Sequence, residues 1–157
     1  MNGAHLHLLV NHIPVLWLPL AVAFLVWALL RDDPRMIRYG FAALVVVGAF
    51  TALAYFTGEP AEEIAEHMTG VSRRLIHDHE EAAELASVVT GAVGFVGLLF
   101  LLAFRRAARI PRWSGTLLVL AGAVAFALMA RAANLGGLIR HPEIHNPVPA
   151  TPPQALR

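Results

Sequence analysis

The chain of 157 residues contains no cysteine and no lysine, and few charged side chains of any kind. Without cysteine it forms neither disulfides nor thiolate-ligated metal centres, and covalent attachment of a c-type haem is excluded. Charged residues make up only 15% of the sequence, against about a quarter in a typical soluble domain. The net charge of +1 points to no particular partner, and we predict no nucleic-acid binding.

The sequence instead contains long apolar segments. Hydrophobic residues make up 57% of the chain, and the mean hydropathy is +0.61. Four charge-free segments approach the roughly 20 residues that cross a bilayer; they are 13–30, 39–58, 85–104 and 113–130. We predict an all-α protein with a four-transmembrane-helix bundle as its single domain, residues 1–140. The basic start and the cleavage site of a signal peptide are not recognisable, so we expect none to be removed.

Start and stop signals refine these boundaries. They place the transmembrane helices at about 8–31, 36–58, 72–107 and 112–135. Pro14 and Pro19 predict a kink in the first helix, because each leaves the carbonyl four residues earlier without a donor. An acidic stretch at 61–68, after Gly58-Glu59-Pro60, is predicted to be a short interfacial helix. The proline-rich residues 141–157 are predicted to form an extended tail.

The arginines predict the orientation of the bundle in a membrane. Seven of the twelve flank the first and third interhelical loops, at positions 31, 35, 38, 105, 106, 109 and 112. By the positive-inside rule both loops are cytoplasmic, and both termini are periplasmic in a bacterial inner membrane. All eight histidines then lie on the exported side, with every acidic residue except Asp32 and Asp33.

The segment 77–97 is the most informative part of the chain. At 100° per residue, one helical face carries His79, Ala83, Ala86, Thr90 and Gly97. An imidazole therefore stands at the mouth of a groove floored by small residues. A flat cofactor fits such a groove, and so does a closely packed neighbouring helix.

Histidines from several helices at one membrane face are typical of b-type haem binding, which needs two axial imidazoles. We predict His12 and His79 as the axial ligands, with His7 and His141 in reserve. Small residues beside the ring leave room for it, and an arginine can meet a propionate. The residues predicted for these two roles are Ala83, Gly94 and Arg140.

Other chemistries remain open for the same residues. Glu59, Glu63 and His141, together with His79, form a candidate site for zinc, iron or manganese. The cluster is also compatible with proton exchange or quinone binding. Alternatively, these polar residues only solvate the helix ends.

Several motifs in the chain carry a resemblance. They are His7-Leu-Leu-Val-Asn-His12-Ile-Pro14, Thr57-Gly-Glu-Pro-Ala-Glu-Glu63, His79-Glu-Glu-Ala-Ala83 and Ala133-Asn-Leu-Gly-Gly-Leu-Ile-Arg-His141-Pro-Glu143. Over roughly residues 5–145 the chain resembles a family of small four-helix bacterial proteins, which are uncharacterised predicted membrane proteins. The resemblance implies no established activity. In layout the chain is similar to small membrane-embedded cytochromes b, which hold haem between histidines on neighbouring helices. Because histidines occur at one membrane face only, we expect a single haem.

These observations predict an electron-transfer subunit of a larger redox complex, embedded in the lipid bilayer. Its expected partners are other membrane subunits, a periplasmic electron carrier and quinol. A stand-alone enzyme is less favoured, since no nucleophile stands beside a base in a recognisable arrangement. The alternative is a non-catalytic accessory membrane subunit, whose small-residue groove would hold a helix of a larger partner.

Overall fold

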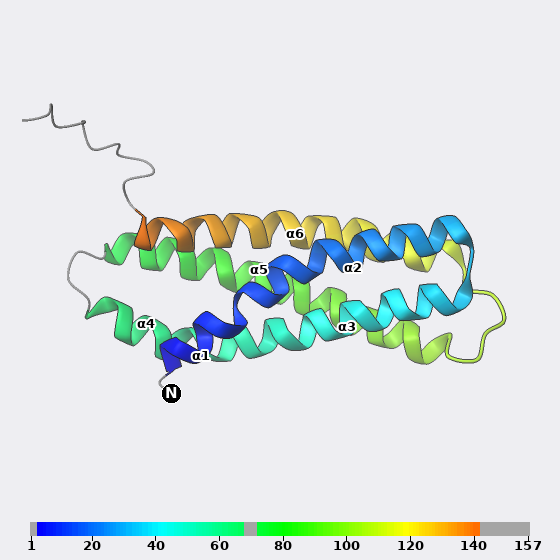
Figure 1. Ribbon diagram of the computed structural model, residues 1–157, viewed down its shortest axis with the longest axis horizontal. Coiled ribbons are helices and arrows are strands. Elements are labelled where there is room, and N and C mark those ends of the chain that lie inside the picture. Colours follow the sequence, from blue (N-terminus) through cyan, green and yellow to red (C-terminus); the bar gives the residue numbers. More distant parts are fainter. Residues whose placement is uncertain (1–2, 68–71, 142–157) are drawn as a thin grey trace, which may run out of the picture.

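A computed structural model describes residues 3–67 and 72–141. These residues are helical apart from short connections (Figure 1), as predicted. The helices are α1 (Gly3–Val10), α2 (His12–Arg31), α3 (Pro34–Phe56), α4 (Gly58–Glu66), α5 (Arg73–Ala103) and α6 (Arg112–Arg140). The predicted tail beyond 141 lies outside the described residues.

The four long helices form an antiparallel bundle in which each contacts two neighbours. Helix α5 packs between α3 and α6, and α2 packs against the same two helices. Four helical spans are long and apolar enough to cross a membrane: His5–Arg31, Pro34–Ile64, Arg73–Ala103 and Arg112–Ile139. The prediction of four helices long and apolar enough to span a membrane is therefore confirmed.

The first predicted helix is broken at Asn11, between α1 and α2. Pro14 has no N–H for the carbonyl of Val10, so the helical ladder is interrupted one turn before the proline. The kink predicted at Pro14 is thus observed, whereas Pro19 lies within α2 without interrupting it. As a result α1 leans away from the axis of α2 and packs chiefly on α4 (Figure 1).

The remaining helix ends differ slightly from the sequence-based boundaries. Helix α5 ends at Ala103, whereas α6 continues through Gly136 and Gly137 as far as Arg140. The short helix expected at 61–68 is α4, which begins at Gly58 directly after α3. Helix α3 begins at Pro34, and Asp33 caps it by accepting a hydrogen bond from the N–H of Arg35 at 2.7 Å.

The small-residue face of α5 is covered by α3 of the same chain. A Cβ on Gly94 would lie 3.0 Å from the Cα of Gly48 and from the carbonyl oxygen of Leu44. A Cβ on Gly97 would lie 3.3 Å from the carbonyl oxygen of Phe41. The two backbones therefore approach closely here, which is the helix-packing use of a small-residue groove.

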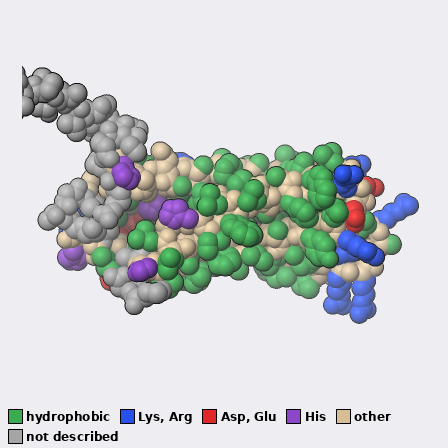
Figure 2. Space-filling view, viewed as in Figure 1, with side chains coloured by type: hydrophobic (Ala, Val, Ile, Leu, Met, Phe, Trp, Pro, Cys, Tyr) green, Lys and Arg blue, Asp and Glu red, His purple; other side chains and the backbone are tan. Residues whose placement is uncertain are grey.

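Large apolar side chains cover the outside of the bundle. Figure 2 shows them as a broad belt between the two polar ends of the molecule. Trp17, Leu20 and Phe95 are each about 60% exposed. Such a surface would be costly in water but is compatible with contact with lipid chains.

Candidate functional site

The histidines and the arginines collect at opposite ends of the bundle. On the face drawn in Figure 2, histidines lie near the end formed by α1 and α4, and most arginines lie at the other end. The histidine end is formed by α1, the ends of α3 and α6, α4, and the start of α5 (Figure 1). Among the residues that the structure describes, this end brings imidazoles from different helices together.

His7 on α1 is half-buried and turned toward the end of α3. Its Nδ1 lies 3.1 Å from the carbonyl oxygen of Ala54 and 3.2 Å from the hydroxyl oxygen of Thr57. Because a carbonyl only accepts, Nδ1 carries the proton and donates it to Ala54. The other ring nitrogen, Nε2, then keeps its lone pair and can bind a metal or accept a proton.

His79 on α5 has the same arrangement on another helix. Its Nδ1 donates to the carbonyl oxygen of Ala132 on α6, at 2.9 Å. The imidazole lies against Gly136, where a Cβ would be 3.0 Å from Cε1 of the ring. Glycine at 136 therefore lets the ring lie flat beside α6, and Nε2 of His79 again keeps its lone pair.

His7 lies within electrostatic range of both His12 and His79. His12, however, is exposed. Its Nδ1 lies 3.4 Å from the carbonyl oxygen of Leu8, which is four residues earlier in the chain. His12 and the buried Pro14 lie on nearly opposite faces of α2. The geometry therefore favours His7 over His12 as the counterpart of His79.

The other residues predicted to surround a haem are more scattered. Ala83 is half-buried one turn after His79 and packs on the core. Gly94 lies deep in the bundle, and α3 leaves no room for a macrocycle beside it. His141 follows the end of α6 and is exposed, with its N–H donating to the carbonyl of Gly137. The side chain of Arg140 lies outside what the structure describes.

The alternative metal site is not assembled in this structure. Glu59 and Glu63 are both exposed on α4. In the part of the chain that the structure describes, no three His, Asp or Glu side chains lie close enough together to hold a metal ion. His7 and His79, whose imidazoles are held by hydrogen bonds to backbone carbonyls, are better organised than this alternative metal site.

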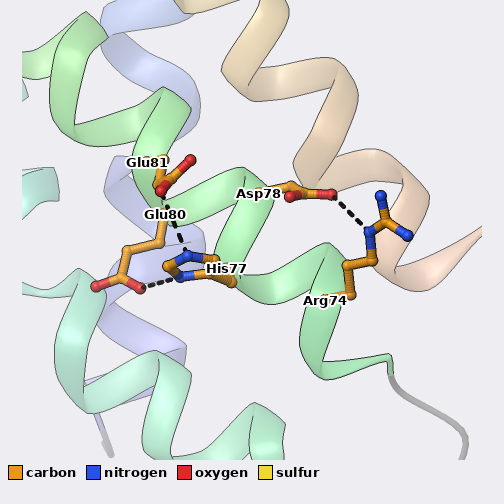
Figure 3. A network of polar contacts seen from close by, with 5 residues as sticks. All are labelled: Arg74, His77, Asp78, Glu80 and Glu81. Carbon is orange, nitrogen blue, oxygen red and sulfur yellow. Dashed lines mark ion pairs between the residues drawn. The ribbon is translucent and has the colours of Figure 1, made fainter.

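Acidic residues at the start of α5 form a separate surface network. His77 lies 3.7 Å from Glu80 and 3.3 Å from Glu81, and Arg74 lies 4.0 Å from Asp78 (Figure 3). All these pairs join residues three or four apart on one helix and are exposed. They contribute little to stability and agree with the expectation that these polar residues solvate a helix end.

Two positions of the site were not identified from the sequence. Thr57 contacts His7 and is held by hydrogen bonds of its own hydroxyl to the carbonyls of Leu53 and Ala54, both at 3.0 Å. Gly136 makes room for His79. The glycine pair 136–137 inside a long apolar helix was the available signal for such a close contact.

Comparison of the chain with models of protein families, with curated proteins and with solved structures gives no match.

Proposed function

We propose that this protein is a membrane-embedded b-type haem protein, with His7 and His79 as the axial ligands. One observation supports this above all others: each imidazole donates Nδ1–H to a backbone carbonyl on a neighbouring helix. Histidines that ligate metals through Nε2 generally hold Nδ1 in this way. The hydrogen bond fixes the tautomer and the ring orientation before any iron is bound.

The surroundings of the two rings are consistent with this proposal. Both carbonyl acceptors belong to alanines, Ala54 and Ala132, and Gly136 lies beside the ring of His79. Small residues of this kind allow a flat ring to approach the helix backbones. A haem iron held there would supply one-electron chemistry, and the two histidines would set its ligation and orientation.

The proposed role is electron transfer, as a subunit of a larger redox complex in a bacterial inner membrane. Both termini and the histidine end would face the periplasm, because the arginine loops would face the cytoplasm. In this orientation α4 would lie at the membrane surface, and quinol and a periplasmic carrier would be the exchange partners. One haem near the exported face matches the placement of all the histidines at that end.

The first test is a reduced-minus-oxidised absorption spectrum of the full-length protein in detergent, with a pyridine haemochrome assay. We expect a b-type α-band at about one haem per chain, since one bis-histidine site binds one haem. His7→Ala and His79→Ala should each abolish the band. His12→Ala is the matched control and should keep it, because His12 is exposed on another face.

Normal haem content in both His7→Ala and His79→Ala would contradict the assignment of ligands. A featureless spectrum from protein produced with ample haem would contradict the haem function itself. Metal analysis and identification of co-purifying subunits would then decide between the metal site and the accessory subunit.

A further inference from the structure

The end of the bundle opposite the histidines carries a large excess of positive charge. We call it the arginine end, and it comprises Arg31, Arg35, Arg38, Arg105, Arg106, Arg109 and Arg112. Asp32 and Asp33 are the only acidic residues in the loops of this end. Seven arginines against two aspartates leave five uncompensated positive charges at one membrane face (Figure 2).

Three of these arginines make contacts within the protein, and two of them, Arg38 and Arg112, tie neighbouring elements together. Arg38 donates from Nη1 to the carbonyl oxygens of Phe104 and Ala107, at 3.2 and 3.1 Å. Arg112 donates from Nη2 to the carbonyl oxygen of Leu29 at 3.1 Å. The guanidinium of Arg31 lies over the ring of Trp27, 5.6 Å from its centroid. Hydrogen bonds therefore tie the end of α2 to the start of α6, and α3 to the loop after α5.

The two aspartates do not neutralise the remaining arginines. Asp33 uses its carboxylate to cap α3, accepting from the N–H groups of Arg35 and Met36. Asp32 occupies the left-handed turn after α2, with φ of 52°. Among the residues that the structure describes, neither Asp32 nor Asp33 forms an ion pair with an arginine within 4.0 Å. Arg35, Arg105, Arg106 and Arg109 thus present exposed guanidinium groups without a carboxylate partner.

Aromatic neighbours indicate where the guanidinium groups of the arginine end lie relative to the bilayer. Trp113 is 59% exposed and Tyr39 is 67% exposed, both beside the arginine end. Exposed tryptophan and tyrosine at the end of an apolar belt are typical of the headgroup level of a bilayer. Guanidinium groups just beyond that level meet phosphodiester oxygens, to which they donate pairs of hydrogen bonds.

We infer that the arginine end is a binding surface for anionic phospholipid headgroups. The surface selects lipids with a net negative charge, such as phosphatidylglycerol, over zwitterionic phosphatidylcholine. Its ligand is the headgroup of a lipid whose chains lie along the apolar belt. This inference does not depend on whether the protein binds haem.

The test compares the association of spin-labelled phosphatidylglycerol and spin-labelled phosphatidylcholine with the full-length protein in phosphatidylcholine vesicles. The test variant is Arg105→Gln/Arg106→Gln, and the matched control is Arg73→Gln/Arg74→Gln at the histidine end. Each variant replaces two adjacent exposed arginines, in the loop just after α5 or at the start of α5. Both leaflets of such vesicles offer the same lipids, so the comparison isolates the arginine end.

We expect the native preference for phosphatidylglycerol to fall by about fivefold or more in the test variant, since each of the two arginines removed contributes a factor of up to about five near an anionic surface. The control should keep the native preference, and added salt should weaken it. Equal association of the two lipids with the native protein would overturn the inference. So would equal losses in the two variants, or displacement of the labelled lipid by millimolar inorganic phosphate at constant ionic strength.

Discussion

Among individual residues, the bundle interior holds two threonine hydroxyls in contrasting settings. Thr51 on α3 is 1% exposed and donates to the carbonyl of Val47 at 2.9 Å. Thr90 on α5 is equally buried, but its Oγ1 has no hydrogen-bond partner within the described residues. A buried polar atom without a partner costs about 1–3 kcal/mol, so Thr90 is a local weak point of the core.

Replacing Thr90 with valine should therefore leave the free energy of unfolding unchanged or raise it by up to about 1 kcal/mol. Valine has the same shape as threonine but carries a methyl group in place of the unsatisfied hydroxyl. Thr51→Val is the control and should lower stability by about 0.5–1.5 kcal/mol, since it removes a satisfied hydrogen bond. Thermal unfolding of both variants in the same detergent checks this. A larger loss in Thr90→Val than in Thr51→Val would show that the hydroxyl of Thr90 is satisfied in the protein.

Individual residues also show how much of the candidate site the sequence predicts. The small-residue face below His79 was visible in the sequence, and so was the group of histidines around the predicted ligand His12, with His7 in reserve. The preference for His7 over His12 was not visible, because it depends on how α1, which precedes the break at Asn11, is rotated relative to α2. Helical periodicity gives the relative direction of side chains only within an unbroken helix, and this break separates the two histidines.

Among the helices, the closest contact joins α3 and α5 at Gly48 and Gly94. The atoms that would oppose a Cβ on Gly94 are a Cα and a carbonyl oxygen, both belonging to the backbone of α3. A backbone cannot turn aside as a flexible side chain can. Gly91, one turn earlier on α5, has nothing within 4 Å of an added Cβ.

Gly94→Ala should lower the stability of the bundle by about 1–3 kcal/mol by forcing α3 and α5 apart. Gly91→Ala should be neutral or stabilising, because alanine is the better helix former by about 1 kcal/mol. Thermal unfolding in detergent again provides the measurement. Equal stabilities for the two variants would contradict the close contact.

The sequence predicted the number of long helices, because runs of apolar residues between arginine-rich and glycine- or proline-containing loops are unambiguous. It left open whether the glycine groove held a cofactor or a helix. That choice depends on the register between α3 and α5, which sets Gly48 opposite Gly94. The extension of α6 to Arg140 was also missed, because Gly136 and Gly137 usually indicate a helix end.

Across the whole molecule, the segregation of charge predicts one orientation in the membrane. The native chain has no cysteine, so a single introduced cysteine is the only thiol available for labelling. Glu63 on α4 and Arg109 in the loop after α5 are both exposed and lie at opposite ends of the bundle.

In intact cells, a membrane-impermeant maleimide should label Glu63→Cys but not Arg109→Cys if the arginine-rich loops are cytoplasmic, as the positive-inside rule predicts. Labelling after the membrane is disrupted provides the control, and both variants should then react. Labelling of Arg109→Cys alone in intact cells would reverse the proposed orientation.

The break at Asn11 also bears on the order in which the protein is assembled. The first membrane-spanning segment, His5–Arg31, includes most of α1, but α1 rests mainly on α4, which comes later in the chain. His7 can therefore reach its acceptor Ala54 at the end of α3 only after α3 and α4 have been synthesised. His79 depends in the same way on Ala132 of α6, so the proposed site would be complete only when the last helix has packed.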